Sequence, residues 1–225
     1  MSAPTVSARE GYRLWAPSYA EETAVSALED AEVRALGVAV TGVRLLDVGC
    51  GVGRRLWRSR ASLGVGVDLV PEMLRVTTIR FACAAADVRA LPFGNDSFDV
   101  VWCRLVLGHV RDIEAAYQEL GRVCASGGVV IVSDLHVAAV AAGHRRTFRD
   151  ESGSLRELEH YVHDLAECQR AARRSSLSLE THRVGRVGPS IEPFYRQARR
   201  EDAYAAQFAL PLVAVMAWRK SAEAA

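Results

Sequence analysis

The stretch from Leu45 to Arg54, which reads LLDVGCGVGR, decides the fold of this chain. An apolar run typical of a buried strand stops at an acid, and three glycines then follow at alternate positions. Alternating glycines let the backbone turn sharply and let a ligand approach bare main chain, where a Cβ atom would collide. The stretch therefore predicts a nucleotide-type cofactor loop at the carboxyl end of a buried strand.

The spacing of these glycines separates the possible cofactors. Gly49, Gly51 and Gly53 run as G-x-G-x-G, whereas the dinucleotide fingerprint needs its third glycine at the position of Arg54. This departure weighs against a nicotinamide-dependent dehydrogenase. No Gly-Lys-Ser/Thr follows, which excludes a P-loop. Asp47 is poorly placed for a diphosphate and well placed for a ligand that carries an ammonium group.

Two further strand-like runs also end in acids. The run Leu63–Asp68 ends 21 residues after Asp47, which is about the separation expected for an acid that accepts from ribose hydroxyls. A third run, Phe81–Ala86, is followed by Asp87, and a fourth strand is expected over Ser97–Arg104. Three acids at successive strand ends form a pattern that a single helix cap or solvated loop does not explain.

These motifs resemble those of the class I S-adenosylmethionine (SAM)-dependent methyltransferases. The loop matches their first motif, D-x-G-x-G-x-G, and the phrase ADVRALPFGNDSFDVV at 86–101 looks like their second block. The resemblance runs roughly from Tyr12 to Lys220. It implies SAM as cofactor and S-adenosylhomocysteine (SAH) as product. It also implies a Rossmann-like, doubly wound α/β fold with a seven-stranded, mostly parallel sheet, an antiparallel C-terminal hairpin and a helical lid.

The rest of the chain is consistent with one domain over residues 1–225. The period of apolar residues predicts a helix over Asp112–Val123, and a β-branched run predicts a buried strand over Val129–Asp134. Leu177–Val184 and Leu210–Trp218 are expected to form the C-terminal hairpin. We expect an N-terminal helical cap over 1–40 and a lid insertion over 137–174. The crossover segments after the glycine loop and after Pro71 are short, so they hold little helix.

The resemblance assigns cofactor contacts residue by residue. Asp68 is expected at the ribose, and Asp87 with the Val88 amide at the adenine. Tyr12 and Tyr19 are expected near the sulfonium, which aromatic faces stabilise. Cys50 is interpreted as a small residue facing the cofactor rather than as a catalytic thiol. The full predicted set is Tyr12, Tyr19, Asp47, Gly49, Cys50, Gly51, Gly53, Asp68, Leu69, Met73, Asp87, Val88, Arg104 and His109.

A protein base is needed only if the acceptor must lose a proton, and histidine suits that role at neutral pH. His136, just past the expected fifth strand, is the leading candidate, with His163 and His109 as the others. His109 can equally be a packing residue at a helix start. The predicted substrate contacts are Trp15, Tyr19, His136 and Arg145. For Trp15, packing of an N-terminal helix is an equal alternative.

The sequence thus predicts a SAM-dependent methyltransferase for a small organic, natural-product-like acceptor at carbon, oxygen or nitrogen in secondary metabolism. Two alternatives stay open: a cyclase or rearrangement catalyst that uses SAM without methyl transfer, and a non-catalytic SAM-binding partner subunit. Five scattered cysteines without Cys-x-x-Cys or zinc spacing predict reduced thiols, a cytoplasmic location and no metal. A net charge of +1 with interleaved acids argues against nucleic acid, and no apolar run is long enough for a membrane. We expect a monomer or homodimer.

Overall fold

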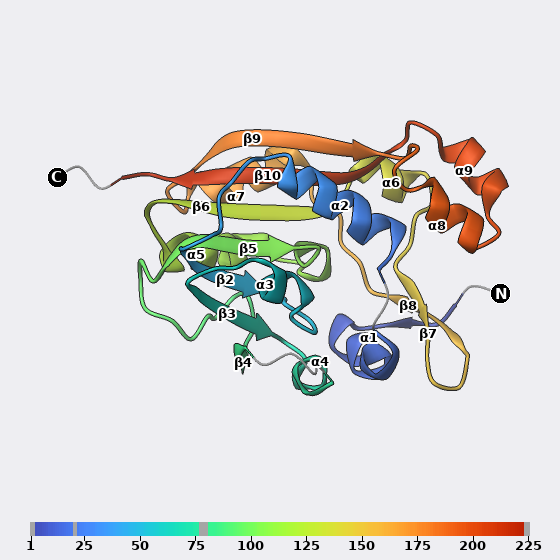
Figure 1. Cartoon of the computed structure of the whole chain (residues 1–225), viewed down its shortest axis with the longest axis horizontal. Coiled ribbons are helices and arrows are strands. Elements are labelled where there is room, and N and C mark those ends of the chain that lie inside the picture. The colour runs from blue at the N-terminus through green and yellow to red at the C-terminus, as the bar shows by residue number, and fades with distance from the viewer. Residues whose placement is uncertain (1–2, 20–21, 77–80, 223–225) are drawn as a thin grey trace.

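One twisted sheet of seven strands organises the molecule (Figure 1). The structure is a computed structural model that describes residues 3–19, 22–76 and 81–222. The strand order is β4-β3-β2-β5-β6-β10-β9, and neighbours are parallel except that β10 runs antiparallel to both β6 and β9. The strands are β2 (Arg44–Val48), β3 (Leu63–Asp68), β4 (Ala82–Ala85), β5 (Phe98–Arg104), β6 (Cys124–Leu135), β9 (Leu177–Arg186) and β10 (Pro211–Lys220). The expected Rossmann-like sheet and its C-terminal hairpin are confirmed.

The central strands are buried on both faces, as their continuous apolar sequences require. Leu45 and Leu46 of β2 show this directly, because they are fully buried yet belong to different core clusters on opposite faces of the sheet. Predicted strand Val129–Asp134 lies within the longer β6, whose residues Ser126–Gly128 form a bulge against β5.

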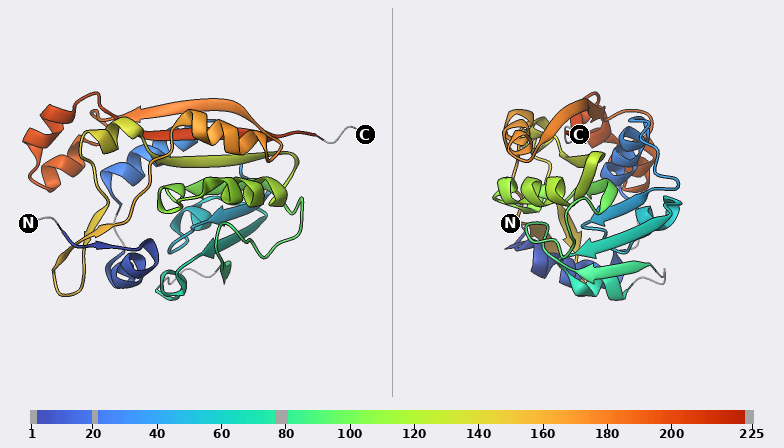
Figure 2. Two further views of the ribbon diagram at one scale, coloured as in Figure 1. Left: turned by 180° about the vertical axis from the view of Figure 1, so that it is seen from behind. Right: turned by 90° about the vertical axis from the view of Figure 1, so that its left-hand side faces the viewer.

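Helices cover both faces of this sheet (Figure 2). α5 (Ile113–Val123) matches the predicted helix and is capped by Asp112, whose side chain accepts from the Glu114 amide. α7 (Leu165–Arg173) shares a core cluster with α5, and α2 (Ala24–Arg34) lies against β9 and β10. Within the expected cap (1–40) and lid (137–174), α2 and α7 pack against the sheet.

The crossovers near the glycine loop are as short as the sequence predicts. α3 (Arg54–Arg58) and α4 (Pro71–Arg75) have five residues each, and Pro71 opens the second. Such short helices cover little of the sheet edge at β3 and β4. Trp57 is therefore 66% exposed and Leu63 49% exposed.

The lid over the carboxyl ends of the strands combines short helices with a small sheet. β1 (Thr5–Val6), β8 (Leu155–Leu158) and β7 (Thr147–Arg149) form a small second sheet beside α1 (Ala8–Trp15) (Figure 1). η1 (Ala16–Ser18) and α6 (Val137–Ala141) are its other short elements. The lid therefore contains helices, as expected, together with strands that the sequence did not predict. The parallel pairing of β1 with β8 joins residues about 150 positions apart, which no local periodicity reveals.

Two further helices, α8 (Glu192–Gln197) and α9 (Glu201–Gln207), connect β9 to β10 in the sequence. They lie at the same end of the sheet as the lid (Figure 1). Their residues Phe194, Tyr195 and Tyr204 pack on a core cluster that contains Val187 and Ile191. None of the helices in the described ranges is long and apolar enough to cross a membrane.

Candidate cofactor and substrate site

A cavity of about 510 Å³ lies where the parallel strands end and the lid begins. That volume falls in the range of small-molecule sites. Most of the predicted site residues line it, namely Tyr12, Trp15, Tyr19, Gly49, Cys50, Gly51, Asp68, Leu69, Asp87, Val88, Arg104, His109 and Arg145. Five do not: Asp47, Gly53, Met73, His136 and His163. The placement of each group explains what it can do.

The three loop positions Gly49, Gly51 and Gly53 require glycine for different steric reasons. All three have positive φ, at 71° for Gly49, 56° for Gly51 and 74° for Gly53. A Cβ on Gly49 would lie 2.2 Å from Val106, and one on Gly53 would lie 2.0 Å from the Phe81 ring. At Gly51 the nearest protein atom would be 3.4 Å away. Only Gly51 therefore offers bare main chain to a ligand, whereas the other two make room for the protein itself.

Asp68 fastens this loop to the end of β3. Its Oδ2 accepts from the Gly51 amide at 2.8 Å, and its Oδ1 accepts from the Val70 amide at 2.9 Å. Burial raises the pKa of the carboxyl, and these two hydrogen bonds oppose that rise. Each carboxylate oxygen has a second lone pair, so the group can still accept from two hydroxyls of a ligand in the cavity.

Asp47 lies behind the loop instead of on the cavity wall. Its side chain is 1% exposed, and neither carboxylate oxygen has a hydrogen-bond partner among the described residues. Burial raises its pKa to about 6, against the pull of Arg55 and Arg104. Asp47 does not line the cavity, so the expected interaction with an ammonium group could act only from behind the loop. An orphaned buried carboxylate at this depth still favours a cation on the cavity floor above it.

Arg104 lines the cavity, and acidic side chains of α2 on its other side bind its guanidinium. Its guanidinium donates to both oxygens of Glu29 at 2.8 and 2.7 Å, and it also pairs with Asp30. Glu29 is fully buried and accepts as well from the Ser133 hydroxyl at 2.6 Å. A buried carboxylate of this kind requires such partners. Sequence reasoning missed Glu29, since a charged residue on a helix normally indicates its solvent face.

The predicted adenine end is shaped by a short turn. Asp87 accepts from the Arg89 amide at 2.9 Å and from its guanidinium at 3.0 and 2.6 Å, and these bonds lower the pKa of the carboxyl. Leu69 is 41% exposed on the cavity wall. Met73 is buried against Val70 beneath it, so the structure gives Met73 a packing position rather than the predicted contact.

An aromatic cluster joins the N-terminal segment to the lid. The rings of Tyr12 and Trp15 stack at 5.9 Å, and Trp15 also stacks on Phe148 of β7 at 5.1 Å. Tyr19 meets the edge of Trp15 at 4.8 Å. Gly11 lets α1 approach this closely, because a Cβ there would lie 2.0 Å from Leu158. Tyr12, Trp15 and Tyr19 all face the cavity.

His109, in η2 (Leu107–His109), is the one predicted base that lines the cavity. Its Nε2 lies 3.1 Å from the Tyr12 hydroxyl and accepts from Arg146 at 3.2 Å, so its Nδ1 carries the proton and donates to the Glu159 carbonyl at 3.2 Å. Burial, followed by the charge of Arg146, lowers its pKa to about 3. His109 is thus neutral at physiological pH and already uses both ring nitrogens.

His136 and His163 have structural partners outside the cavity. The Nδ1 of His136 accepts from the Ala138 amide at 3.1 Å and caps α6. The Nε2 of His163 donates to the Val110 carbonyl at 2.8 Å, while Nδ1 lies 3.0 Å from Glu167. Neither histidine is therefore placed to act on a ligand in the cavity, which corrects the expectation that His136 is the base.

Two functional candidates were missed in the sequence. Arg146 forms a buried ion pair with Asp134 and donates to the Leu105 carbonyl at 3.0 Å. His144 lines the cavity, and its Nε2 is buried without a hydrogen-bond partner in the described part of the chain. The only sequence signal was the arginine cluster around them, and it did not show that Arg146 turns inward whereas Arg145 is 48% exposed.

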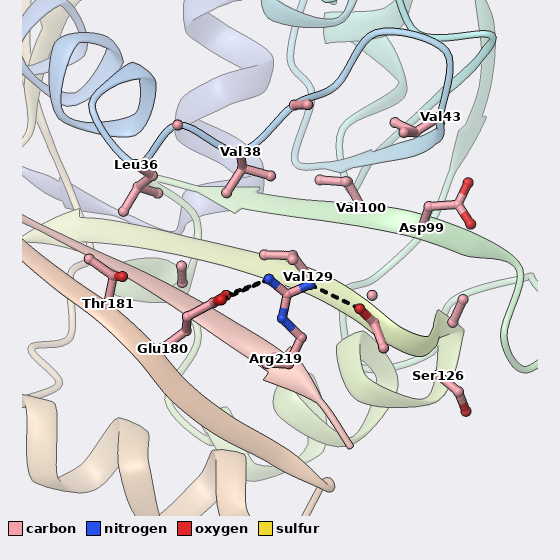
Figure 3. A pocket seen from close by; sticks show the side chains of 16 residues that line it. Leu36, Val38, Val43, Asp99, Val100, Ser126, Val129, Glu180, Thr181 and Arg219 are labelled. Atoms are coloured by element: carbon pink, nitrogen blue, oxygen red, sulfur yellow. Dashed lines mark hydrogen bonds and ion pairs between the residues drawn. The ribbon is translucent and has the colours of Figure 1, made fainter. Parts of the chain in front are cut away.

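A second cavity, also about 510 Å³, lies at the opposite ends of the strands (Figure 3). It is lined by Val100, Val129 and the bulge of β6. Its main charges are paired, since Arg219 donates to Glu180 at 2.8 Å and to the Gly127 carbonyl at 2.9 Å (Figure 3). None of the predicted site residues lines it, so the first cavity is the functional candidate.

Comparison with known proteins identifies this arrangement. A family model described as a methyltransferase domain matches residues 46–132, the region of the glycine loop and the three acids. A solved SAM-dependent methyltransferase from Mesorhizobium loti aligns with a TM-score of 0.65 and 21% identity, over 85% of this chain and 97% of that one. The glycine-loop region is thus similar to methyltransferase domains, and the fold resembles that of the SAM-dependent methyltransferases.

The relatives of this methyltransferase domain differ in what they do. A malonyl-[acyl-carrier protein] O-methyltransferase of Serratia marcescens is 35% identical over 121 residues, which is 51% of this chain and 48% of that protein. The [4+2]-cyclase SpnF shares the fold at a TM-score of 0.64 and 19% identity, over 99% of this chain and 98% of SpnF. The chain spans about half the length of the curated relatives it matches.

SAM, the cofactor that these similarities imply, fits the residues present. Gly51 leaves main chain open, Asp68 retains lone pairs toward the cavity, and the orphaned Asp47 favours a cation close by. Within residues 3–19, 22–76 and 81–222 no group of three or more His, Cys, Asp or Glu is arranged to hold a metal ion.

Proposed function

We propose that this chain transfers a methyl group from SAM to a small organic acceptor of the natural-product type, as part of secondary metabolism. The observation that carries the proposal is the continuity of one cavity, from Gly51 and Asp68 at the strand ends to Trp15 and Arg145 at the lid. A cofactor and an acceptor bound together need such a shared space. Relatives named as O-methyltransferases and as a demethylmenaquinone methyltransferase support transfer chemistry.

The wall formed by the strand ends would hold the cofactor. Asp68 is positioned for the ribose and Asp87 with Val88 for the adenine. Tyr12 and Tyr19 present aromatic rings that stabilise a cation such as a sulfonium. When bound, SAM supplies the activated methyl group. The protein then mainly aligns the acceptor with that group, and such positioning lowers the barrier substantially.

The wall formed by the lid would hold the acceptor. Trp15, Tyr161 and Arg145 line this side, so it offers aromatic surface together with a cation. We assign His144 as the base for an acceptor that must lose a proton. Burial lowers its pKa below the ordinary 6.5, against the opposing effect of Gln207, so the ring is neutral near pH 7, and its buried Nε2 makes no hydrogen bond to the described residues. His109 serves instead to position Tyr12.

We further propose a cytoplasmic protein that acts as a monomer or homodimer without nucleic acid. The five free cysteines support a reducing compartment. Light scattering on the purified chain measures the oligomeric state, and a larger assembly would contradict this part.

Calorimetric titration with SAM, SAH and NADH is the first test. We expect micromolar binding of SAM and SAH and no binding of NADH, followed by a screen of acceptors for products heavier by one methylene. Consumption of SAM must equal product formed. Product of unchanged mass with SAM intact would favour a cyclase or rearrangement, and binding without any turnover would favour a partner subunit. No binding of SAM or SAH would overturn the proposal.

A further inference from the structure

Two cysteines that are far apart in the sequence both neighbour Gly66 of β3, Cys50 through its side chain and Cys83 through strand pairing. Cys50 belongs to the glycine loop, is buried and lines the cavity. Cys83 lies on β4, the edge strand, and is exposed. The proposed function uses neither thiol chemically. The other three cysteines are all buried elsewhere in the core, in the cluster around α5 and α7.

Gly66 brings these two side chains within reach of each other. The Sγ of Cys50 lies 2.7 Å, and its Cβ 3.1 Å, from the point where a Cβ on Gly66 would stand. Cys50 and the Phe81 ring, whose Cε2 also lies 2.7 Å from that point, together fill the space left by the missing side chain. Gly66 in turn pairs in register with Cys83 across β3 and β4. Paired residues of neighbouring strands project from the same face and start about 4.8 Å apart.

This spacing is compatible with a disulfide. A disulfide needs Cβ atoms about 3.5–4.5 Å apart, and Cys83 starts roughly one strand spacing from the point that Cys50 already occupies. β4 is a four-residue edge strand bonded on one side only, so it can adjust by that amount. A negative charge on Cys83 contributes to raising the pKa of Cys50, after burial and the charges of Asp47 and Asp68.

The two thiols differ in accessibility, and this sets the order of events. Cys83 is exposed, so an oxidant in solution reaches it first. Burial raises the pKa of Cys50 and keeps it a thiol in the resting protein. Because the thiolate is the nucleophile, the raised pKa protects Cys50 from the oxidant and also makes its attack on an oxidised neighbour the slow step.

We propose that Cys50 and Cys83 are a redox pair that closes into a disulfide under hydrogen peroxide. Cys83 attacks one peroxide oxygen, the O–O bond breaks, and the products are a sulfenic acid on Cys83 and one water. The Cys50 sulfur then attacks the Cys83 sulfur, the S–O bond breaks, and hydroxide leaves with the Cys50 proton as a second water. Two thiols are oxidised by two electrons, and one peroxide is reduced to two waters.

Closure would act on cofactor binding through the loop. Cys50 lies between Gly49 and Gly51, and its amide donates to the Val67 carbonyl at 3.0 Å. Pulling its side chain toward β4 changes the loop beside Gly51, the one loop glycine whose bare face is open to a ligand. We expect the disulfide form to bind SAH at least about tenfold more weakly than the thiol form.

The test begins with the reduced full-length protein and measured doses of hydrogen peroxide. Free thiols are then alkylated and the tryptic peptides are identified by mass spectrometry. We expect a linked peptide pair containing Cys50 and Cys83, a loss of two hydrogens in the intact mass, and recovery of both SAH affinity and thiols with dithiothreitol. Bound SAH should slow the linkage, because it covers the loop.

Cys83→Ser is the matched control, since Cys83 does not line the cavity. It should bind SAH as the wild type does and keep that affinity after peroxide. Addition of oxygen to Cys83 alone, with Cys50 still open to alkylation after unfolding, would overturn the proposal. A disulfide that leaves SAH affinity unchanged would overturn its regulatory part. The mass measurement requires neither SAM nor turnover, so it is decided separately from the proposed function.

Discussion

The two walls of the cavity are held together in different ways. The cofactor wall is fixed by main-chain bonds: the amides of Gly49 and Cys50 both donate to the Val67 carbonyl, at 2.8 and 3.0 Å, and Asp68 binds two further amides. The lid wall depends on side chains from distant segments, such as the contact between Tyr12 and His109 and the stacking of Trp15 on Phe148. We conclude that the first wall is preformed for one cofactor, whereas the second is free to vary with the acceptor.

Replacing His144 should give the largest effect and should leave the cofactor wall intact. His144→Gln removes the proposed base, so kcat should fall about 100-fold or more for an acceptor that loses a proton. The kcat of the wild type should decline as pH falls through the lowered pKa, below pH 6.5, because the ring must be neutral to accept a proton. SAH affinity, measured by calorimetry, should not change.

His136→Gln is the control for that experiment, since His136 caps α6 outside the cavity. A loss of turnover in His136→Gln that equals the loss in His144→Gln would contradict the assignment. An unchanged pH profile in His144→Gln would do the same.

Asp47→Asn tests how much the buried carboxylate beneath the cofactor wall destabilises the fold. The carboxyl has a pKa of about 6 in the fold against an ordinary 3.8, which corresponds to about 3 kcal/mol. Because the pKa of Asp47 is raised in the fold, the protonated carboxyl contributes fully to the free energy of unfolding below pH 4. This contribution is lost as pH rises through 6 and the buried group ionises. The free protein should therefore gain stability at pH 7.5 on substitution, with no such gain at pH 4.

Urea unfolding of both proteins at the two pH values measures this difference. The same free-energy change at pH 4 and pH 7.5 would show that Asp47 does not titrate as its burial indicates. The variant should also bind SAH more weakly, because the favourable carboxylate beneath the cavity floor is gone.

Asp68→Ala breaks the cofactor wall directly. It removes a charged acceptor that fastens Gly51 and is positioned for the ribose, so SAH binding should weaken by about 1.5–3 kcal/mol. Circular dichroism should remain that of the wild type. Asp202→Ala, at an exposed position of α9, is the control and should bind normally. Unchanged SAH affinity in Asp68→Ala would refute this placement of the ribose.

Tyr12→Phe loosens the lid wall and should have the smallest effect. It removes one hydroxyl contact to His109 at 3.1 Å, which is worth about 1 kcal/mol, or roughly fivefold in kcat/KM for the acceptor. Hydrogen exchange in α1 should become faster while exchange in the glycine loop stays the same. Faster exchange in the loop as well would mean that the two walls are coupled rather than separate.

The same contrast separates what could be predicted from what could not. The glycine loop and Asp68 were found because their roles rest on main-chain conformation at strand ends, which neighbouring residues specify. The α5 helix and its Asp112 cap were found for the same local reason. Asp47 was found as part of the motif but misplaced, since only the packing of Arg55 and Arg104 around it shows that it lies behind the loop.

The sequence by itself determined the succession of strands along the chain, the cofactor loop and the acids near the ends of β2 and β3, because these features depend on short-range patterns of glycine, acid and apolar residues. Only the tertiary structure decided which side chains meet at the lid. His144 rather than His136 faces the cavity, Arg146 turns inward, and β1 pairs with β8. Such contacts join segments far apart in the chain, and their energies arise from burial and pairing that no local stretch encodes.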